Sequence, residues 1–135
     1  MKAEDGQRPA VDIGERTLDY GVRAVRLFRA LQQQPDRAGW VIARQYLRSA
    51  TSVGANIAEA QSAETRADFV HKHGIALKEA RESMYWLRLM AKSGLLPSEK
   101  LRPLQRETEE IIAIVTTIIV RSKKKANQSA PGPRG

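Results

Sequence analysis

The chain has 135 residues, a mass of 15.1 kDa and no cysteine, which fits one domain and excludes disulfide frameworks, thiolate metal sites and cysteine nucleophiles. Arginine and lysine outnumber aspartate and glutamate by 23 to 15, so the net charge is +8. This surplus favours a polyanionic partner. The longest apolar run, residues 111–120, is about half of the roughly 20 residues that a membrane-spanning helix needs, and residues 1–10 contain no apolar signal segment. We therefore expect a cytoplasmic protein without a membrane partner.

Four helices are predicted, at about residues 12–34, 36–61, 63–93 and 98–124. Apolar residues recur every three or four positions in each, which is typical of an amphipathic helix. Asp12, Asp36 and Ser98 suit N-caps, and Gly94 suits the left-handed position after a helix. Short connections between long helices favour antiparallel neighbours. The predicted fold class is all-α, an antiparallel up-down-up-down four-helix bundle over residues 12–125.

The β-branched run at residues 111–120, IIAIVTTIIV, could alone be taken for a strand. Leu101 and Leu104 extend its periodicity upstream at helical spacing, and no second strand-like segment could pair with it, so a helix is predicted. The segments 1–11 and 126–135 are rich in Gly, Pro, Ser, Gln and Ala and lack periodicity. We expect both to be disordered tails.

The predicted helices carry more apolar residues than one bundle core needs. Apolar side chains of the fourth helix cover roughly 160° of its circumference, against about 100° for an ordinary core stripe. Long neighbouring side chains could cover this surface within a monomer, but exposed apolar patches usually mark interfaces. We therefore expect self-association through side chains that lie off the main stripes of the third and fourth helices: Ile75, Trp86, Ile112 and Ile119.

Two strings go beyond a generic helix: SVGANIAE at residues 52–59, and ALKEA with YWL at 76–80 and 85–87. Together they resemble the bacterial four-helix-bundle family, also called the 23S rRNA intervening-sequence proteins, over about residues 17–125. The resemblance implies a bundle that assembles as a homo-oligomer, typically a pentamer. Relatives that accompany diversity-generating retroelements bind nucleic acid and a reverse transcriptase, so such partners are implied. The resemblance supplies no catalytic residue.

Polar residues in and around these strings are expected to form a network that fixes helix register or subunit geometry, because buried polar groups need partners. The alternative is a ligand pocket. The expected members are Asn56, Glu59, Lys78, Glu79 and Ser83.

Motifs of nucleophilic, phosphate-binding and metal-dependent enzymes are absent from the sequence. His71 and His73 are two residues apart on a helix, so they point about 200° from each other and cannot share a metal ion. His73 falls on the core stripe and is expected to be a hydrogen-bonded core histidine. We expect no enzyme activity, no metal and no cofactor.

Several basic residues have no acid at helical spacing. Asp12 precedes Arg16 by four positions and Asp19 precedes Arg23 by four, so these two arginines are expected to be neutralised. The remaining candidates for binding nucleic acid are Arg26, Arg29, Arg37, Arg44, Arg48, Arg121, Lys123, Lys124 and Lys125. No aromatic platform is apparent, so recognition would depend on backbone charge. The alternative is a solvated face that keeps the protein soluble.

The expected function is that of a non-enzymatic, homo-oligomeric accessory protein that binds the RNA or DNA backbone. Five copies at +8 each would carry about +40, a strong field for phosphates. The alternative is a protein–protein interaction scaffold that does not touch nucleic acid.

Overall fold

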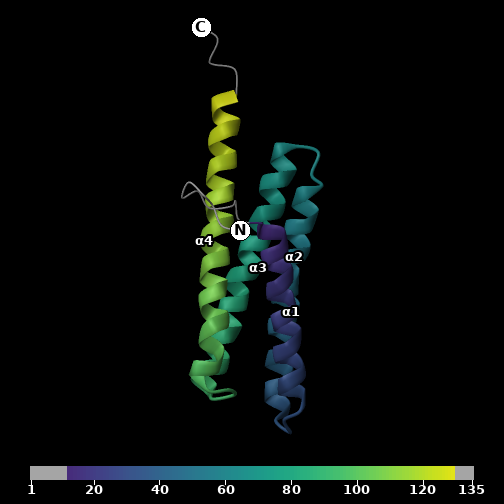
Figure 1. The fold of residues 1–135 in the computed structure, drawn as a ribbon, viewed down its shortest axis with the longest axis vertical. Coiled ribbons are helices and arrows are strands. Elements are labelled where there is room, and N and C mark those ends of the chain that lie inside the picture. Colours follow the sequence, from purple (N-terminus) through teal and green to yellow (C-terminus); the bar gives the residue numbers. More distant parts are fainter. Residues whose placement is uncertain (1–11, 130–135) are drawn as a thin grey trace, which may run out of the picture.

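The computed structural model describes residues 12–129 and contains four long helices. They are α1 (Ile13–Gln32), α2 (Arg37–Gln61), α3 (Arg66–Ser93) and α4 (Ser98–Ser129). Successive helices run in opposite directions, so the α1–α2 and α3–α4 loops lie at one end of the bundle and the α2–α3 loop at the other (Figure 1). The predicted all-α four-helix bundle is confirmed, and none of the described residues forms a strand.

Side-chain caps start three of the four helices. Asp12 accepts a hydrogen bond from the Glu15 N–H and Asp36 accepts one from the Ala38 N–H, as the sequence predicts. Gly94 ends α3 with a φ of 75°, a conformation that glycine adopts without steric cost. The sequence predicts that the third helix begins at residue 63, but α3 begins three residues later, at Arg66. Thr65 is its N-cap, because the Thr65 side chain accepts a hydrogen bond from the Asp68 N–H.

The last helix is longer than predicted. It continues to Ser129, so residues 126–129, expected in a tail, are helical. Ser98 is its first residue rather than its cap, and Pro103 lies inside it. The predicted tail segments 1–11 and 130–135 lie outside the described residues.

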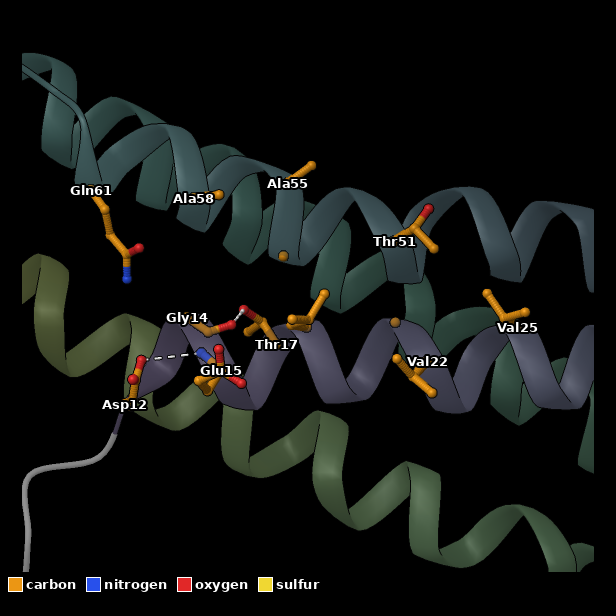
Figure 2. Close-up of a pocket in the computed structure, with 13 residues that line it drawn as sticks. Asp12, Gly14, Glu15, Thr17, Val22, Val25, Thr51, Ala55, Ala58 and Gln61 are labelled. Atoms are coloured by element: carbon orange, nitrogen blue, oxygen red, sulfur yellow. Dashed lines mark hydrogen bonds between the residues drawn. The ribbon is translucent and has the colours of Figure 1, made fainter.

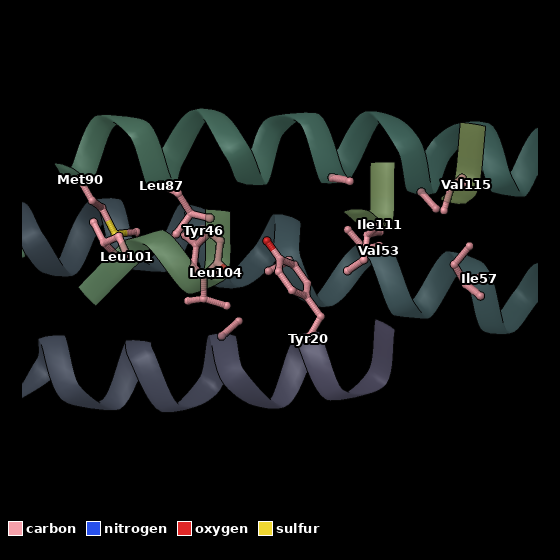
Figure 3. Close-up of a cluster of buried hydrophobic side chains, with 14 of the residues drawn as sticks. Tyr20, Tyr46, Val53, Ile57, Leu87, Met90, Leu101, Leu104, Ile111 and Val115 are labelled. Atoms are coloured by element: carbon pink, nitrogen blue, oxygen red, sulfur yellow. The ribbon is translucent and has the colours of Figure 1, made fainter. Parts of the chain in front are cut away.

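The core runs along the inner faces of all four helices (Figure 3). Tyr46, Ala50, Val53 and Ile57 of α2 and Leu101, Ile111 and Val115 of α4 are fully buried, and Thr17 and Tyr20 of α1 join them in the core. Tyr20 and Tyr46 meet edge to face, with ring centroids 6.3 Å apart. Burial raises the pKa of both phenols. His73 is buried and its Nδ1 lies 2.8 Å from the Phe69 carbonyl oxygen, which confirms the expected core histidine.

The helices α1 and α4 approach each other least closely of all neighbouring pairs, and polar side chains link them. Arg16 Nε lies 2.7 Å from Glu107 Oε2, and Arg16 Nη2 lies 2.8 Å from Glu110 Oε1. The Tyr20 hydroxyl lies 2.5 Å from that of Thr108. We call this set of contacts the α1–α4 seam. It corrects the predicted pairing of Arg16 with Asp12, whose carboxylate caps α1 instead.

Candidate functional site

The largest concentration of positive charge lies at the end of the bundle that carries the α1–α2 and α3–α4 loops. We call this region, residues 26–44 and 88–106, the basic end. It contains nine basic residues and only two acids, Asp36 and Glu99, so its formal charge is +7 out of +8 for the chain. All nine basic side chains are exposed: Arg26, Arg29, Arg37, Arg44, Arg88, Lys92, Lys100, Arg102 and Arg106.

The cations of the basic end are not neutralised within residues 12–129. The ion pairs of the described residues join Arg16, Arg48 and Lys72 to glutamates, and all of them lie outside the basic end. Cations crowded at one end repel each other, and a line of phosphates would relieve that repulsion. The basic end therefore carries a strong, uncompensated positive charge.

Only four of these nine cations were predicted from the sequence. Arg26, Arg29, Arg37 and Arg44 come from α1 and α2, whereas the other five come from the segment 88–106 of α3 and α4. The two segments are far apart in the chain, but the predicted antiparallel topology already brings both loops to one end. That topology was the signal that could have identified the whole site.

Arg48, another predicted contact, has a different role. Its guanidinium forms ion pairs with Glu79, at 3.4 Å, and with Glu82, both on α3. The sequence shows no acid near Arg48 because its partners lie more than 30 positions away. Arg48 therefore links α2 to α3 rather than adding to the unpaired charge.

The remaining predicted cations form a second, separate group. Arg121, Lys123, Lys124 and Lys125 are exposed on the last turns of α4. Figure 1 shows these turns projecting beyond the bundle at the end opposite the basic end. The nine residues predicted to bind nucleic acid thus do not form one surface.

The predicted polar network is not a single network. Lys72 Nζ lies 2.7 Å from Glu59 Oε1, and this ion pair raises the pKa of Lys72. The Asn56 side-chain amide donates to the backbone carbonyl of Ser52, and the Ser83 hydroxyl donates to the Ser49 hydroxyl oxygen over 2.9 Å. Lys78 is exposed. The Glu59–Lys72 and Ser49–Ser83 contacts link α2 to α3, whereas the Asn56 contact lies within α2, and together they do not form one network.

Most of the apolar surplus that the sequence suggested is covered by the chain itself. Trp86, Ile112 and Ile119 are half-buried and pack against the core, and Ile75 is half-buried. The Trp86 indole N–H also donates to Glu82 over 2.9 Å. The large apolar side chains that remain exposed are others: Leu18, Val22, Trp40, Val41, Tyr85 and Val120.

Two of these exposed side chains, Leu18 and Val22, line a groove of about 700 Å³ between the outer faces of α1 and α2 (Figure 2). Small residues form much of its floor, and the helices nearly touch there. A Cβ atom added at Gly54 would lie 3.0 Å from the Thr17 carbonyl oxygen. The groove is mostly apolar and has the acids Asp12 and Glu15 at one end.

None of the helices in residues 12–129 has an apolar stretch long enough to cross a membrane. Within the same residues no three His, Asp or Glu side chains are grouped so as to hold a metal ion.

The geometry thus defines a class: a small all-helical bundle with a concentrated positive charge and an apolar groove on its outer surface. The chain belongs to the 23S rRNA-intervening sequence protein family, whose sequence model matches residues 22–117. This confirms the family that the two sequence strings indicated.

Among solved structures, the chain is similar to a protein with unknown function from the S23 ribosomal protein family of Bacteroides thetaiotaomicron. The two are 38% identical with a TM-score of 0.74, over 79% of this chain and 97% of the other. No curated protein matches the chain.

Proposed function

We propose that this chain is a non-enzymatic, homo-oligomeric accessory protein whose basic end binds the phosphate backbone of RNA or DNA. The observation that carries the proposal is the net charge of +7 at the basic end, where nine basic side chains are exposed and only two acids occur. Binding of basic side chains to phosphates releases condensed counterions, which supplies most of the affinity of non-specific nucleic-acid binding. No catalytic constellation is needed for this role.

Self-association is the second part of the proposal, and the α1–α2 groove supports it. Leu18 is 58% exposed and Val22 is 41% exposed, and both flank a floor of small residues that a helix can approach closely. A second copy covering this groove would remove apolar surface from water. The resemblance to a family that typically forms pentamers favours the same conclusion.

The nucleic-acid part is tested by measuring affinity for RNA and DNA oligonucleotides between about 50 and 300 mM salt. We expect binding at low salt that weakens steeply as salt rises, because phosphate contacts displace counterions. The double variant Arg44→Gln, Arg88→Gln should weaken binding. The double variant Lys78→Gln, Arg81→Gln removes the same charge from exposed α3 positions outside the basic end and should weaken binding less. Undetectable binding at low salt would reject this function.

The self-association part is tested by sedimentation velocity at micromolar concentration. Leu18→Glu places a charge in the groove and should shift the protein toward smaller species. Val41→Glu introduces the same charge at a position outside the groove that is 61% exposed, and should leave the size unchanged. A native chain that sediments as a single 15.1 kDa species would refute this part of the proposal.

One observation favours a second candidate function, a protein–protein interaction scaffold without nucleic-acid binding. The α1–α2 groove could hold an amphipathic helix of another protein in place of a second copy. Pull-downs from cell extract with and without nuclease separate the two functions. A partner retained after nuclease treatment and lost with Leu18→Glu would support the scaffold.

A further inference from the structure

Trp40 is an aromatic side chain placed among the cations of the basic end. It lies in the first turn of α2, three residues after Arg37 and four before Arg44. Residues at this spacing share one face of a helix. The indole is 39% exposed and both arginines are exposed, so cationic groups flank an accessible ring.

The Trp40 ring is also held in place. Its Nε1–H donates to the Gln34 carbonyl oxygen over 2.8 Å, which ties the indole to the α1–α2 loop. A fixed ring loses little conformational entropy when a ligand contacts it. The indole therefore has its polar atom satisfied while apolar ring surface still faces water.

The second tryptophan of the chain shows the contrast. Trp86 packs against the core and donates to Glu82, so both its ring and its N–H serve the fold. Trp40 is not part of the core cluster. Tryptophan is usually well covered, and an exposed one beside unpaired arginines is the arrangement that binds bases and phosphates together.

We propose that Trp40 stacks on an unpaired base of single-stranded nucleic acid while Arg37 and Arg44 hold the neighbouring phosphates. The inference rests on the proposed function and narrows its ligand from any nucleic acid to single strands. A duplex offers phosphates to the arginines, but its base faces are already stacked on each other. Stacking on aromatic side chains is sequence-tolerant, because every base has a π face.

The test compares single strands with a duplex of the same length, about 12 nucleotides, which is within the range that single-strand binding sites cover. RNA and DNA strands of the same sequence are measured separately, so that a preference for either nucleic acid is detected. Affinity is measured by fluorescence anisotropy at low salt with the native chain, Trp40→Leu, Trp40→Phe and Val41→Leu. Val41 is the adjacent exposed apolar residue and serves as the matched control.

We expect Trp40→Leu to weaken single-strand binding by about 5- to 100-fold, the usual range for loss of one base–aromatic stack. Trp40→Phe should recover part of the affinity, and Val41→Leu should match the native chain. Duplex affinity should change less than twofold in all variants. Preserved helical circular dichroism shows that each variant folds.

A spectroscopic readout reports the contact directly. In Trp86→Phe, Trp40 is the only tryptophan of the chain, so its emission reports on the stacking position alone. Single strands should quench it at saturation and the duplex should not. If Trp86→Phe does not fold, the affinities of the Trp40 variants measured by anisotropy, in chains that keep Trp86, test the proposal instead.

The outcomes separate this inference from the function on which it rests. If neither single strands nor duplex bind at low salt, the proposed function fails and this inference fails with it. If both bind, and Trp40→Leu lowers the affinity for single strands and for the duplex equally or not at all, then stacking on Trp40 is refuted while binding to the phosphate backbone still stands. A smaller oligomer of Trp40→Leu in sedimentation would indicate that Trp40 lies in a contact between copies, and this result would also refute stacking of Trp40 on a base.

Discussion

The α1–α4 seam and the basic end are both rich in polar groups, but the two regions use them in opposite ways. In the seam, Arg16 is 27% exposed and Glu107 17% exposed, and their charges satisfy each other across two helices. At the basic end nine cations face water without an ion pair among the described residues.

The difference follows from burial. A partly buried charge must be paired, since its desolvation is otherwise uncompensated, so the seam uses charge to hold α1 against α4. An exposed charge needs no partner for folding and adds little to stability. Unpaired charge at the basic end is therefore not needed for the fold, and under the proposed function substitutions in the two regions should have separable effects.

The largest effect is expected from neutralising the basic end. Changing Arg37, Arg44, Arg88 and Lys92 to Gln should lower nucleic-acid affinity on the order of 100-fold at low salt and flatten the salt slope by about 3. The free energy of unfolding should stay the same or rise, because like charges are removed. Affinity against salt and urea denaturation measure the two quantities.

The tip of α4 provides a control with the same change in charge. Changing Arg121, Lys123, Lys124 and Lys125 to Gln also removes four cations, but from the group that lies away from the basic end. An equal loss of affinity in both quadruple variants would show that total charge, not its placement, determines binding.

Alkaline pH should unfold the bundle through its buried tyrosines. The pKa of Tyr20 and of Tyr46 is raised in the fold, so their stabilising effect is complete below about pH 10 and declines above it, as the unfolded chain ionises. The free energy of unfolding should fall by about 1.4 kcal/mol per pH unit for each tyrosine. Tyrosinate absorbance should therefore rise together with the loss of helical circular dichroism, and Tyr46→Phe should make the decline shallower. Ionisation of all three tyrosines in an intact helical bundle would contradict the assigned burial.

Breaking the seam should cost stability without affecting binding. Glu107→Gln removes a charged acceptor from Arg16, and we expect a loss of about 1–2 kcal/mol in the free energy of unfolding. Glu109→Gln, at an exposed neighbouring position, should change it by less than about 0.5 kcal/mol. Equal stability of the two variants in urea denaturation would mean that the seam pair does not hold the helices together.

The smallest effect is expected from introducing one more acidic residue at the basic end. Gln105 and Glu109 lie with Arg88 and Lys92 around a shallow depression between α3 and α4, so Gln105→Glu should add a second carboxylate that forms exposed ion pairs there. We expect a gain of about 0.3–0.5 kcal/mol in stability and a several-fold loss of nucleic-acid affinity. Gln61→Glu makes the same change in the α1–α2 groove and should leave affinity nearly unchanged. Equal effects of the two variants on affinity would argue against a local site.

The sequence was sufficient to predict features that depend only on residues a few positions apart in the chain. Helix periods, the caps Asp12 and Asp36, the stop at Gly94 and the core position of His73 all depend on spacings of a few residues, and all were predicted. The start of α3 was missed because Ser62 and Thr65 both suit a cap, and only the second is placed to accept from the helix.

The sequence was insufficient for contacts between helices. Arg16 has an acid four residues before it, yet it pairs with Glu107, 91 positions away. Arg48 has no acid nearby, yet α3 neutralises it with two glutamates. Such pairings depend on the register of one helix against another, and a helical wheel contains no information on that register. The exposure of Trp40 was missed for the same reason.

The length of α4 separates the two positively charged groups by a fixed interval. Arg102 and Lys124 lie on the same continuous helix, 22 residues apart, which at 1.5 Å per residue is about 33 Å. In a duplex, each strand has one phosphate per about 3.4 Å of helix axis, so a duplex of about ten base pairs is needed to reach from one to the other, whereas an extended single strand needs fewer nucleotides. Under the proposed function, oligomers too short to span this interval would contact one positively charged group, and longer ones would contact both and gain avidity, so affinity should rise with ligand length.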